Sequence, residues 1–64
     1  MLSEVERDIL FAVAKGLSNA EVGGVMHLDR RTVRTHLGHI YDKLGVTGHV
    51  AAVVEALRRG LVDI

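Results

Sequence analysis

The amino-acid sequence predicts an all-α domain built from four helices, and three observations support this. Apolar residues recur every three or four positions along most of the chain, which is the spacing of one helix face. Seven glycines punctuate the chain, and proline is absent. No stretch shows the alternation of apolar and polar residues that is typical of a strand. The 64 residues include no cysteine, so we expect a single domain at 1–64, without disulfides or thiolate zinc sites.

The first helix is predicted at residues 3–15. Ser3 and Glu6 have the spacing of a capping box, in which each side chain bonds the backbone N–H of the other residue. Glu6 could also be read as a catalytic acid, but its place in the capping box explains it better. Gly16 is expected to end the helix.

The second helix is predicted at residues 19–26, where Ser18 and Glu21 form another capping box. Gly23 and Gly24 lie inside this helix, and each costs up to about 1 kcal/mol relative to alanine. We interpret the glycines as allowing a close approach between helices. Residues 27–29 then form a short connection.

The third helix, predicted at residues 30–44, organises the chain. Asp29 stands at its expected N-cap, and Gly45 stands where a left-handed residue would end it. Its apolar back is formed by Val33, Leu37, Ile40 and Leu44. The opposite side, here called the front face, comprises Arg31, Arg34, Thr35, Gly38 and Asp42. Together with Arg30, this end of the helix carries three arginines and no acidic residue over its first three turns.

The fourth helix is predicted at residues 48–59, with Thr47 as its cap and Gly60 at its end. Apolar residues cover more than one of its faces, which predicts burial on two sides. We expect one side to pack on the core, together with Leu61 and Val62, and the other to pack on a second subunit.

A short helix, a tight turn and a longer helix with a polar front face form the helix-turn-helix arrangement. In that arrangement the second helix enters the major groove of double-stranded DNA. The planar fork of arginine suits guanine edges, while threonine and lysine suit phosphate oxygens. The chain carries eight basic and eight acidic residues, so the local arginine cluster, and not the net charge, indicates a nucleic-acid partner.

Several short motifs then make the prediction more specific. They are Leu2-Ser3 with Glu6, Ile9-Leu10, Gly16-Leu17-Ser18-Asn19 with Glu21-Val22, Thr32-Val33-Arg34-Thr35-His36, Ile40, Lys43-Leu44-Gly45-Val46, Ala52, and Arg58-Arg59-Gly60-Leu61-Val62. Through these residues the chain resembles the LuxR-type (GerE-like) helix-turn-helix domain that ends many bacterial transcriptional regulators. The resemblance implies transcription regulation by sequence-specific DNA binding, with a recognition helix at about 30–44.

The resemblance also implies roles for individual residues. Arg34 and Thr35 would contact base edges. Near the DNA backbone or the groove wall would lie Arg31, Thr32, His39, Lys43 and Thr47. His49 stands where an arginine is common, so its phosphate contact would be weaker and pH-dependent. Gly38 stands where a long polar side chain is common, so one contact would be absent, and Gly23 and Gly24 also depart from the pattern.

Further partners are implied in the same way. The fourth helix would form a homodimer through Val50, Val53, Val54 and Leu57. Such domains usually follow a receiver domain, as in a response regulator, or a ligand-binding domain, and RNA polymerase is a further expected partner. No apolar run is long enough to span a membrane, so we expect a cytoplasmic protein.

Other function classes receive less support. His36 and His39 lie one turn apart, but neither has a third or fourth partner for a metal ion. No nucleophile–base pair or phosphate-binding loop occurs, so we expect no enzyme activity, no metal and no cofactor. The remaining alternative is a protein-docking or dimerisation module that keeps the helix-turn-helix scaffold without binding DNA, and the apolar fourth helix favours it.

Overall fold

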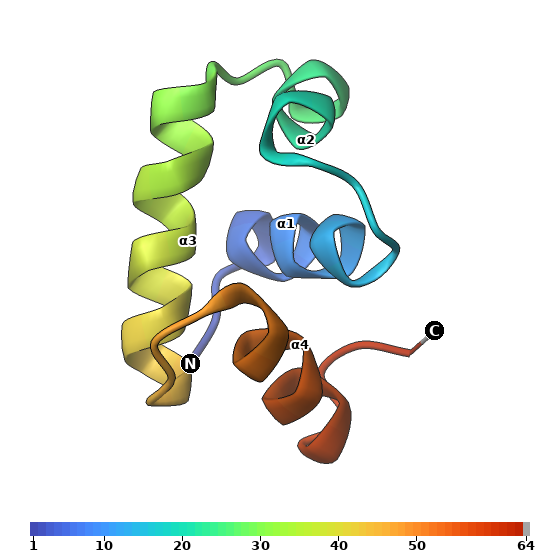
Figure 1. The fold of residues 1–64 in the computed structure, drawn as a ribbon, viewed down its shortest axis with the longest axis vertical. Coiled ribbons are helices and arrows are strands. Elements are labelled where there is room, and N and C mark those ends of the chain that lie inside the picture. The colour runs from blue at the N-terminus through green and yellow to red at the C-terminus, as the bar shows by residue number, and fades with distance from the viewer. Residues whose placement is uncertain (64) are drawn as a thin grey trace.

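The computed structural model describes residues 1–63 and contains four helices and no strand over that range. The helices are α1 (Glu4–Ala14), α2 (Asn19–Met26), α3 (Arg30–Leu44) and α4 (His49–Arg58). The predicted all-α fold is therefore confirmed, with each helix end within one residue of its predicted position. The predicted domain extends to residue 64, which lies outside the described residues. Figure 1 shows α3 along the longest axis of the molecule, with α2, α1 and α4 beside it from top to bottom.

Side-chain caps begin the first three helices, as predicted. In α1 and α2 a serine hydroxyl accepts from the backbone N–H three residues later, and the glutamate there accepts from the serine N–H. These pairs are Ser3 with Glu6 and Ser18 with Glu21. In α3 the Oδ1 atom of Asp29 accepts from the N–H of Thr32 at 2.7 Å. Each cap satisfies a backbone donor that has no partner within its own helix.

The predicted cap of α4 is wrong. Gly48, not Thr47, is the N-cap, and no side chain bonds the first turn. The carbonyl of Gly48 accepts from the N–H of Ala52 at 2.9 Å, so the helix begins one residue later than a Thr47 cap requires. Thr47 is exposed and leaves the first turn of α4 uncapped by any side chain.

All four helices end with the same backbone motif. After each helix, the residue that follows a left-handed residue donates its N–H back to a carbonyl five residues earlier, at 2.8–3.2 Å. The donors are Leu17, Leu28, Val46 and Leu61, all partly buried against the core. The left-handed residues are Gly16, His27, Gly45 and Gly60. Each turn thus both ends a helix and adds an apolar side chain to the core.

The back of α3 forms the centre of the core. Val33, Leu37, Ile40 and Leu44 are all buried, as predicted. They pack with Leu2, Ile9, Leu10, Val13, Val22, Ala52, Ala56 and Val62 from the other parts of the chain. Because this stripe is enclosed by the rest of the domain, the orientation of the front face of α3 is fixed.

The two glycines of α2 differ in their surroundings. A Cβ on Gly23 would collide with the carbonyl oxygen of Leu28, and it would lie 3.7 Å from Val33 Cγ2 on α3. Gly23 therefore permits the close approach that the sequence predicts, although the tightest contact is with the turn and not with a helix. A Cβ on Gly24 would meet nothing within 4 Å, so the predicted packing role is wrong for Gly24.

Candidate nucleic-acid interface

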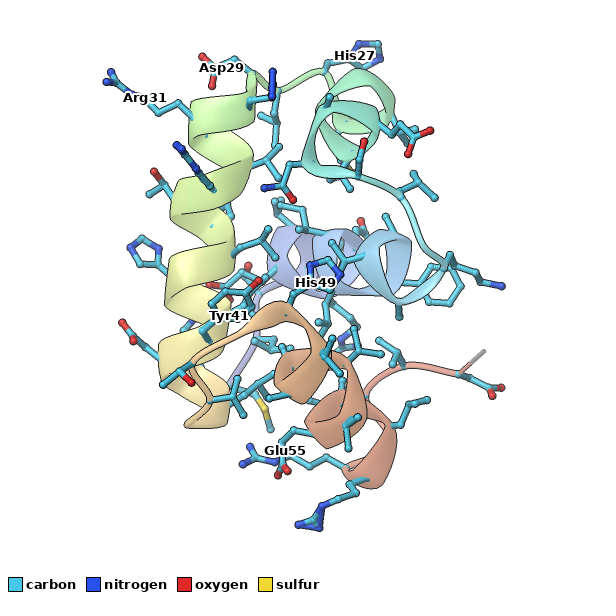
Figure 2. All side chains as sticks on the ribbon, viewed as in Figure 1. His27, Asp29, Arg31, Tyr41, His49 and Glu55 are labelled. Atoms are coloured by element: carbon cyan, nitrogen blue, oxygen red, sulfur yellow. The ribbon has the colours of Figure 1, made fainter. Side chains whose placement is uncertain are left out.

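The front face of α3 is open to solvent. Arg31, Arg34, Thr35, Gly38 and Asp42 are all exposed along it. Figure 2 shows Arg31 extending from the first turn of α3 beside Asp29, away from the other helices. The structure therefore brings the two predicted base-reading residues, Arg34 and Thr35, onto one accessible surface with Arg31.

On the described part of the chain, the arginines of this surface form no intramolecular ion pair. Among residues 1–63, ion pairs join Lys43 to Glu6 and join Glu55 to both Arg58 and Arg59. Arg30, Arg31 and Arg34 take part in none of them. The nearby carboxylate of Asp29 is engaged at the helix start, where the N–H of Thr32 lowers the pKa of its carboxyl group. Positive charge therefore remains available at a helix N-terminus, whose partial positive charge adds to it.

A surface hollow of about 340 Å³ lies between the start of α2 and the start of α3. It is lined by Asn19, Arg30 and Arg34. Asn19 was not among the site residues predicted from the sequence, because only the packing of α2 against α3 brings it beside the arginines. An amide and two guanidinium groups around one hollow offer several N–H donors, which suits a phosphate group.

The hydroxyl of Thr35 has a defined role as an acceptor. Its Oγ1 atom donates to the carbonyl oxygen of Arg31, at 3.0 Å. While this bond is made, the hydroxyl proton is used inside the helix, and the oxygen is left to accept from an external group. Amino groups of cytosine or adenine in the major groove are donors of that kind, and the thymine methyl suits the methyl group of threonine.

The backbone of Thr32 takes part in the cap of α3, and its side chain is only partly accessible. Its side chain is half-buried, and its N–H is engaged by Asp29. It stands in the first turn of α3, between Arg31 and the buried Val33. The predicted groove-wall contact of Thr32 would therefore come from the part of its side chain that remains accessible.

Lys43 lies at the opposite end of α3 and has intramolecular partners. Its ammonium is 2.7 Å from Glu6 Oε1 and 3.3 Å from the carbonyl oxygen of Met1. Figure 1 shows the N-terminus beside the C-terminal end of α3, which is where these groups meet. The hydrogen bonds from Lys43 and from the Ser3 backbone lower the pKa of Glu6 to about 2. Lys43 therefore connects α3 to α1, and any phosphate contact must compete with this ion pair.

The other predicted phosphate contacts are spread over several elements. His39 is exposed on α3, Thr47 is exposed in the turn before α4, and His49 is exposed at the start of α4. Figure 2 shows His49 near the middle of the molecule, well apart from Arg31. His49 does not join the arginine cluster and would have to contact DNA at a separate point, whereas His39 follows Thr35 by one turn of α3.

The exposed side of α4 is apolar. Val50, Val54 and Leu57 are 75%, 51% and 44% exposed, and their spacing places them on one stripe. Val53 is partly buried and packs against the core of its own chain. Arg59, which follows α4, bonds both Glu55, at 2.7 Å, and the carbonyl oxygen of Leu44, at 3.2 Å, and these bonds hold α4 against the end of α3. Three of the four predicted dimerisation residues are therefore accessible on the described chain.

The described part of the chain shows neither a metal-binding cluster nor a membrane-spanning helix. Within residues 1–63, no three side chains of the His, Asp and Glu types lie close enough together to hold a metal ion. None of the helices in this part of the chain is long and apolar enough to cross a lipid bilayer.

Comparison with known proteins identifies the same scaffold. Residues 1–56 match the family described as bacterial regulatory proteins, luxR family. A putative HTH-type transcriptional regulator of Mycobacterium bovis is 46% identical over 59 residues, which are 92% of this chain and 7% of the relative. The response regulator VraR of Staphylococcus aureus is 40% identical over 63 residues, which are 98% of this chain and 30% of VraR. The chain thus spans only a small part of these relatives.

Two solved structures share the fold. The transcription factor GerE superposes with a TM-score of 0.90 at 31% identity, covering 97% of this chain and 92% of GerE. The response regulator ChrA, from a heme-sensing two-component system, superposes with a TM-score of 0.92 at 41% identity. That match covers 95% of this chain and 30% of ChrA.

Proposed function

This chain belongs to the luxR family of bacterial regulatory proteins, which are DNA-binding transcription regulators and not a class of enzymes, and we propose that it reads DNA by placing the front face of α3 in the major groove. The observation that supports this most is the group of exposed arginines on α3, which form no ion pair with any other residue of 1–63. The buried back of the helix holds that group in one orientation. A helix of this kind fits the width of the major groove.

Within this proposal the residues have different tasks. Arg34 and the acceptor hydroxyl of Thr35 contact base edges in the second turn of α3. The accessible part of Thr32 lines the groove wall. The hollow between α2 and α3, lined by Asn19, Arg30 and Arg34, receives a phosphate group, and Arg31 contacts the adjacent backbone. Phosphate contacts of this kind fix the position of the helix, while base contacts determine the preferred sequence.

Further phosphate contacts come from His39, Thr47 and His49, with Lys43 at the end of α3. All four have exposed side chains or side-chain ends on the described chain. His39 and Lys43 lie beyond the arginine cluster on α3, and Thr47 and His49 lie at the start of α4. They would extend the interface along the DNA backbone away from the bases that Arg34 contacts.

The apolar stripe of α4 supports a second part of the proposal. Val50, Val54 and Leu57 would meet the same residues of a second copy, with Val53 at the edge of the contact. Two copies related by a twofold axis would place two α3 helices on half-sites about one DNA turn, or roughly 10 base pairs, apart.

Other partners would act through the rest of a longer regulator. The chain corresponds to 30% of the response regulator VraR, and a domain of this family that accompanies a receiver or ligand-binding domain would be controlled by it. RNA polymerase is the partner through which bound DNA would be linked to transcription in the bacterial cytoplasm.

A protein-docking module is the second candidate, and the exposed apolar stripe of α4 favours it. On that interpretation α4 would bind another protein, and α3 would be a solvated surface without a ligand. The two candidates differ in how their affinity for DNA depends on salt. A DNA-binding domain neutralises phosphates and releases counterions, so its affinity falls steeply as the salt concentration rises. A docking module would not bind DNA appreciably at any salt concentration.

Binding to duplex DNA across a salt series tests the choice. We expect the affinity for a random duplex to fall steeply, with a slope of about −2 to −3 in log–log form if Arg30, Arg31 and Lys43 each neutralise one phosphate. The Arg7→Ala variant is the control, because Arg7 is exposed on α1 outside the residues assigned to DNA. If the wild-type chain binds no duplex even at low salt, the proposed DNA binding is contradicted, and the docking module is the candidate that remains.

A further inference from the structure

We propose that Gly38 is a specificity-determining position of this domain, because the missing side chain lets the backbone of α3 lie directly against base edges in the major groove. This inference rests on the proposed DNA-binding function of α3. Gly38 makes no side-chain contact itself, but it controls how deeply Arg34 and Thr35 reach into the major groove.

Gly38 occupies the middle of the front face. It follows Arg34 by four residues and Thr35 by three, so the three residues are neighbours on the helix surface. Gly38 is exposed, and it stands in the interior of the 15-residue helix, far from either end. Gly38 would therefore face the DNA that the front face contacts.

The fold itself gives no reason for glycine at this position. A Cβ on Gly38 would meet nothing within 4 Å, and its backbone is not left-handed. By contrast, Gly16, Gly45 and Gly60 have positive φ angles, and Gly23 avoids a collision with Leu28. Gly24 shares the open surroundings of Gly38, but it lies on α2 outside the front face of α3. A glycine inside a helix lowers helix stability relative to alanine. The domain thus carries a destabilising residue at the centre of its proposed interface.

Thr35 supplies the physical reason for an open position. Its side chain is short, and its hydroxyl proton is already donated to the Arg31 carbonyl. It can reach a base edge only if the helix backbone comes close to the groove floor. Glycine is the residue that permits such close approach of a backbone to a ligand. A larger side chain one turn further on would hold the helix away and separate Thr35 from the bases.

The spacing also locates the base pair concerned. Four helical residues rise by about 6 Å, which corresponds to roughly two base-pair steps when the helix follows the groove. Gly38 therefore lies against a base pair about two steps from the one that Arg34 contacts. The base preferred at that base pair would depend on the space between it and the α3 backbone at Gly38.

The test compares Gly38→Ala with Gly24→Ala. Gly24 is a matched control, since it is also helical, exposed and free of neighbours within 4 Å, but it lies on α2 outside the residues assigned to DNA. Both variants should melt about 4–8 °C higher than the wild-type chain, because alanine favours the helix. Binding is measured on the duplex that the wild-type chain selects from a randomised library, and on a random duplex.

We expect Gly38→Ala to bind the selected duplex about tenfold more weakly, with little change on the random duplex. Gly24→Ala should bind both as the wild-type chain does. A new selection with Gly38→Ala should change the preferred base about two steps from the Arg34 position. If Gly38→Ala matches Gly24→Ala in affinity and selects the same sequence, the inference is overturned while DNA binding stands. Failure of the wild-type chain to bind any duplex would instead overturn the proposed function, and this inference with it.

Discussion

The ammonium of Lys43 lies 2.7 Å from the Oε1 atom of Glu6, and this ion pair joins the end of α3 to the start of α1. Glu6 is 5% exposed, and its carboxylate also accepts the N–H of Ser3. The Glu6 side chain thus both caps α1 and neutralises a lysine on α3. The pair holds the helix that would contact DNA against the helix that supports it.

Acid should weaken the fold through Glu6. Its pKa is lowered from 4.5 to about 2, mainly by the hydrogen bond from Lys43. A carboxyl group with a lower pKa in the folded state stabilises the fold above its unfolded pKa, and loses that contribution as the pH falls through the folded value. The shift corresponds to about 3 kcal/mol, which the partial exposure of Lys43 reduces to about 1–3 kcal/mol.

Chemical denaturation between pH 5 and pH 2 measures this contribution. The wild-type chain should lose about 1–3 kcal/mol more than the Glu6→Gln variant over that range. Glu21, Asp29 and Glu55 also have lowered pKa values and remain in both proteins, so the difference isolates Glu6. Parallel pH profiles for the two proteins would show that the ion pair contributes nothing to stability.

Lys43→Ala should affect both stability and DNA binding. Removing the lysine leaves the Glu6 carboxylate without its cation, which should lower the free energy of unfolding by about 1–3 kcal/mol. At a temperature where the variant is folded, binding to selected and random duplexes should weaken equally, with the salt slope reduced by about one unit. Glu6→Gln is the control, because it releases the lysine and should leave the slope unchanged. A change of sequence preference in Lys43→Ala would mean that α3 is docked differently.

The adjacent glycines of α2 should respond oppositely to alanine. Gly23→Ala should lower the free energy of unfolding by about 1–3 kcal/mol, since the new methyl group must displace the Leu28 carbonyl. Gly24→Ala should raise it by up to about 1 kcal/mol, because no atom occupies the added space. Melting curves of the two variants check this directly, and equal shifts in one direction would contradict the packing described for Gly23.

Replacing Val54 by glutamate should abolish self-association through α4. Val54 is 51% exposed at the centre of the apolar stripe, so a charge there would be buried without a partner in a dimer. Sedimentation with DNA that carries two half-sites should show two wild-type chains on each duplex. The Val54→Glu variant should occupy each half-site independently and more weakly. Val25→Glu is the matched control, since Val25 is 65% exposed on α2. If Val54→Glu still associates as the wild-type chain does, the dimer forms elsewhere.

The sequence predicts local features of this domain well, because their causes lie within a few residues. Ser3 with Glu6, Ser18 with Glu21, and Asp29 are caps whose partners are three positions away, and the back stripe of α3 follows from helical spacing alone. The ends at Gly16, Gly45 and Gly60 are equally local. The Thr47 cap was wrong because two neighbouring residues could both begin α4, and only the observed backbone distinguishes them.

Features that depend on tertiary contacts could not be predicted. Glu6 was recognised as a cap, but its pairing with Lys43 joins residues 37 positions apart. Asn19 becomes part of the candidate site only because α2 packs beside the start of α3. The left-handed His27 lacks the glycine that marks such residues in a sequence. The Glu6–Lys43 pair and the place of Asn19 are set by how helices are placed relative to one another, which spacing along one helix does not determine.

The central claim is that Arg34 contacts base edges, and one measurement tests it most directly. The affinity of Arg34→Ala is compared with that of the wild-type chain on the selected duplex and on random DNA, with Arg7→Ala as the control and melting curves to confirm folding. We expect Arg34→Ala to lose about 1–3 kcal/mol of binding free energy on the selected duplex and much less on random DNA. The preference for the selected sequence should therefore disappear. If Arg34→Ala binds each of the two duplexes as tightly as the wild-type chain does, the placement of α3 in the major groove is contradicted.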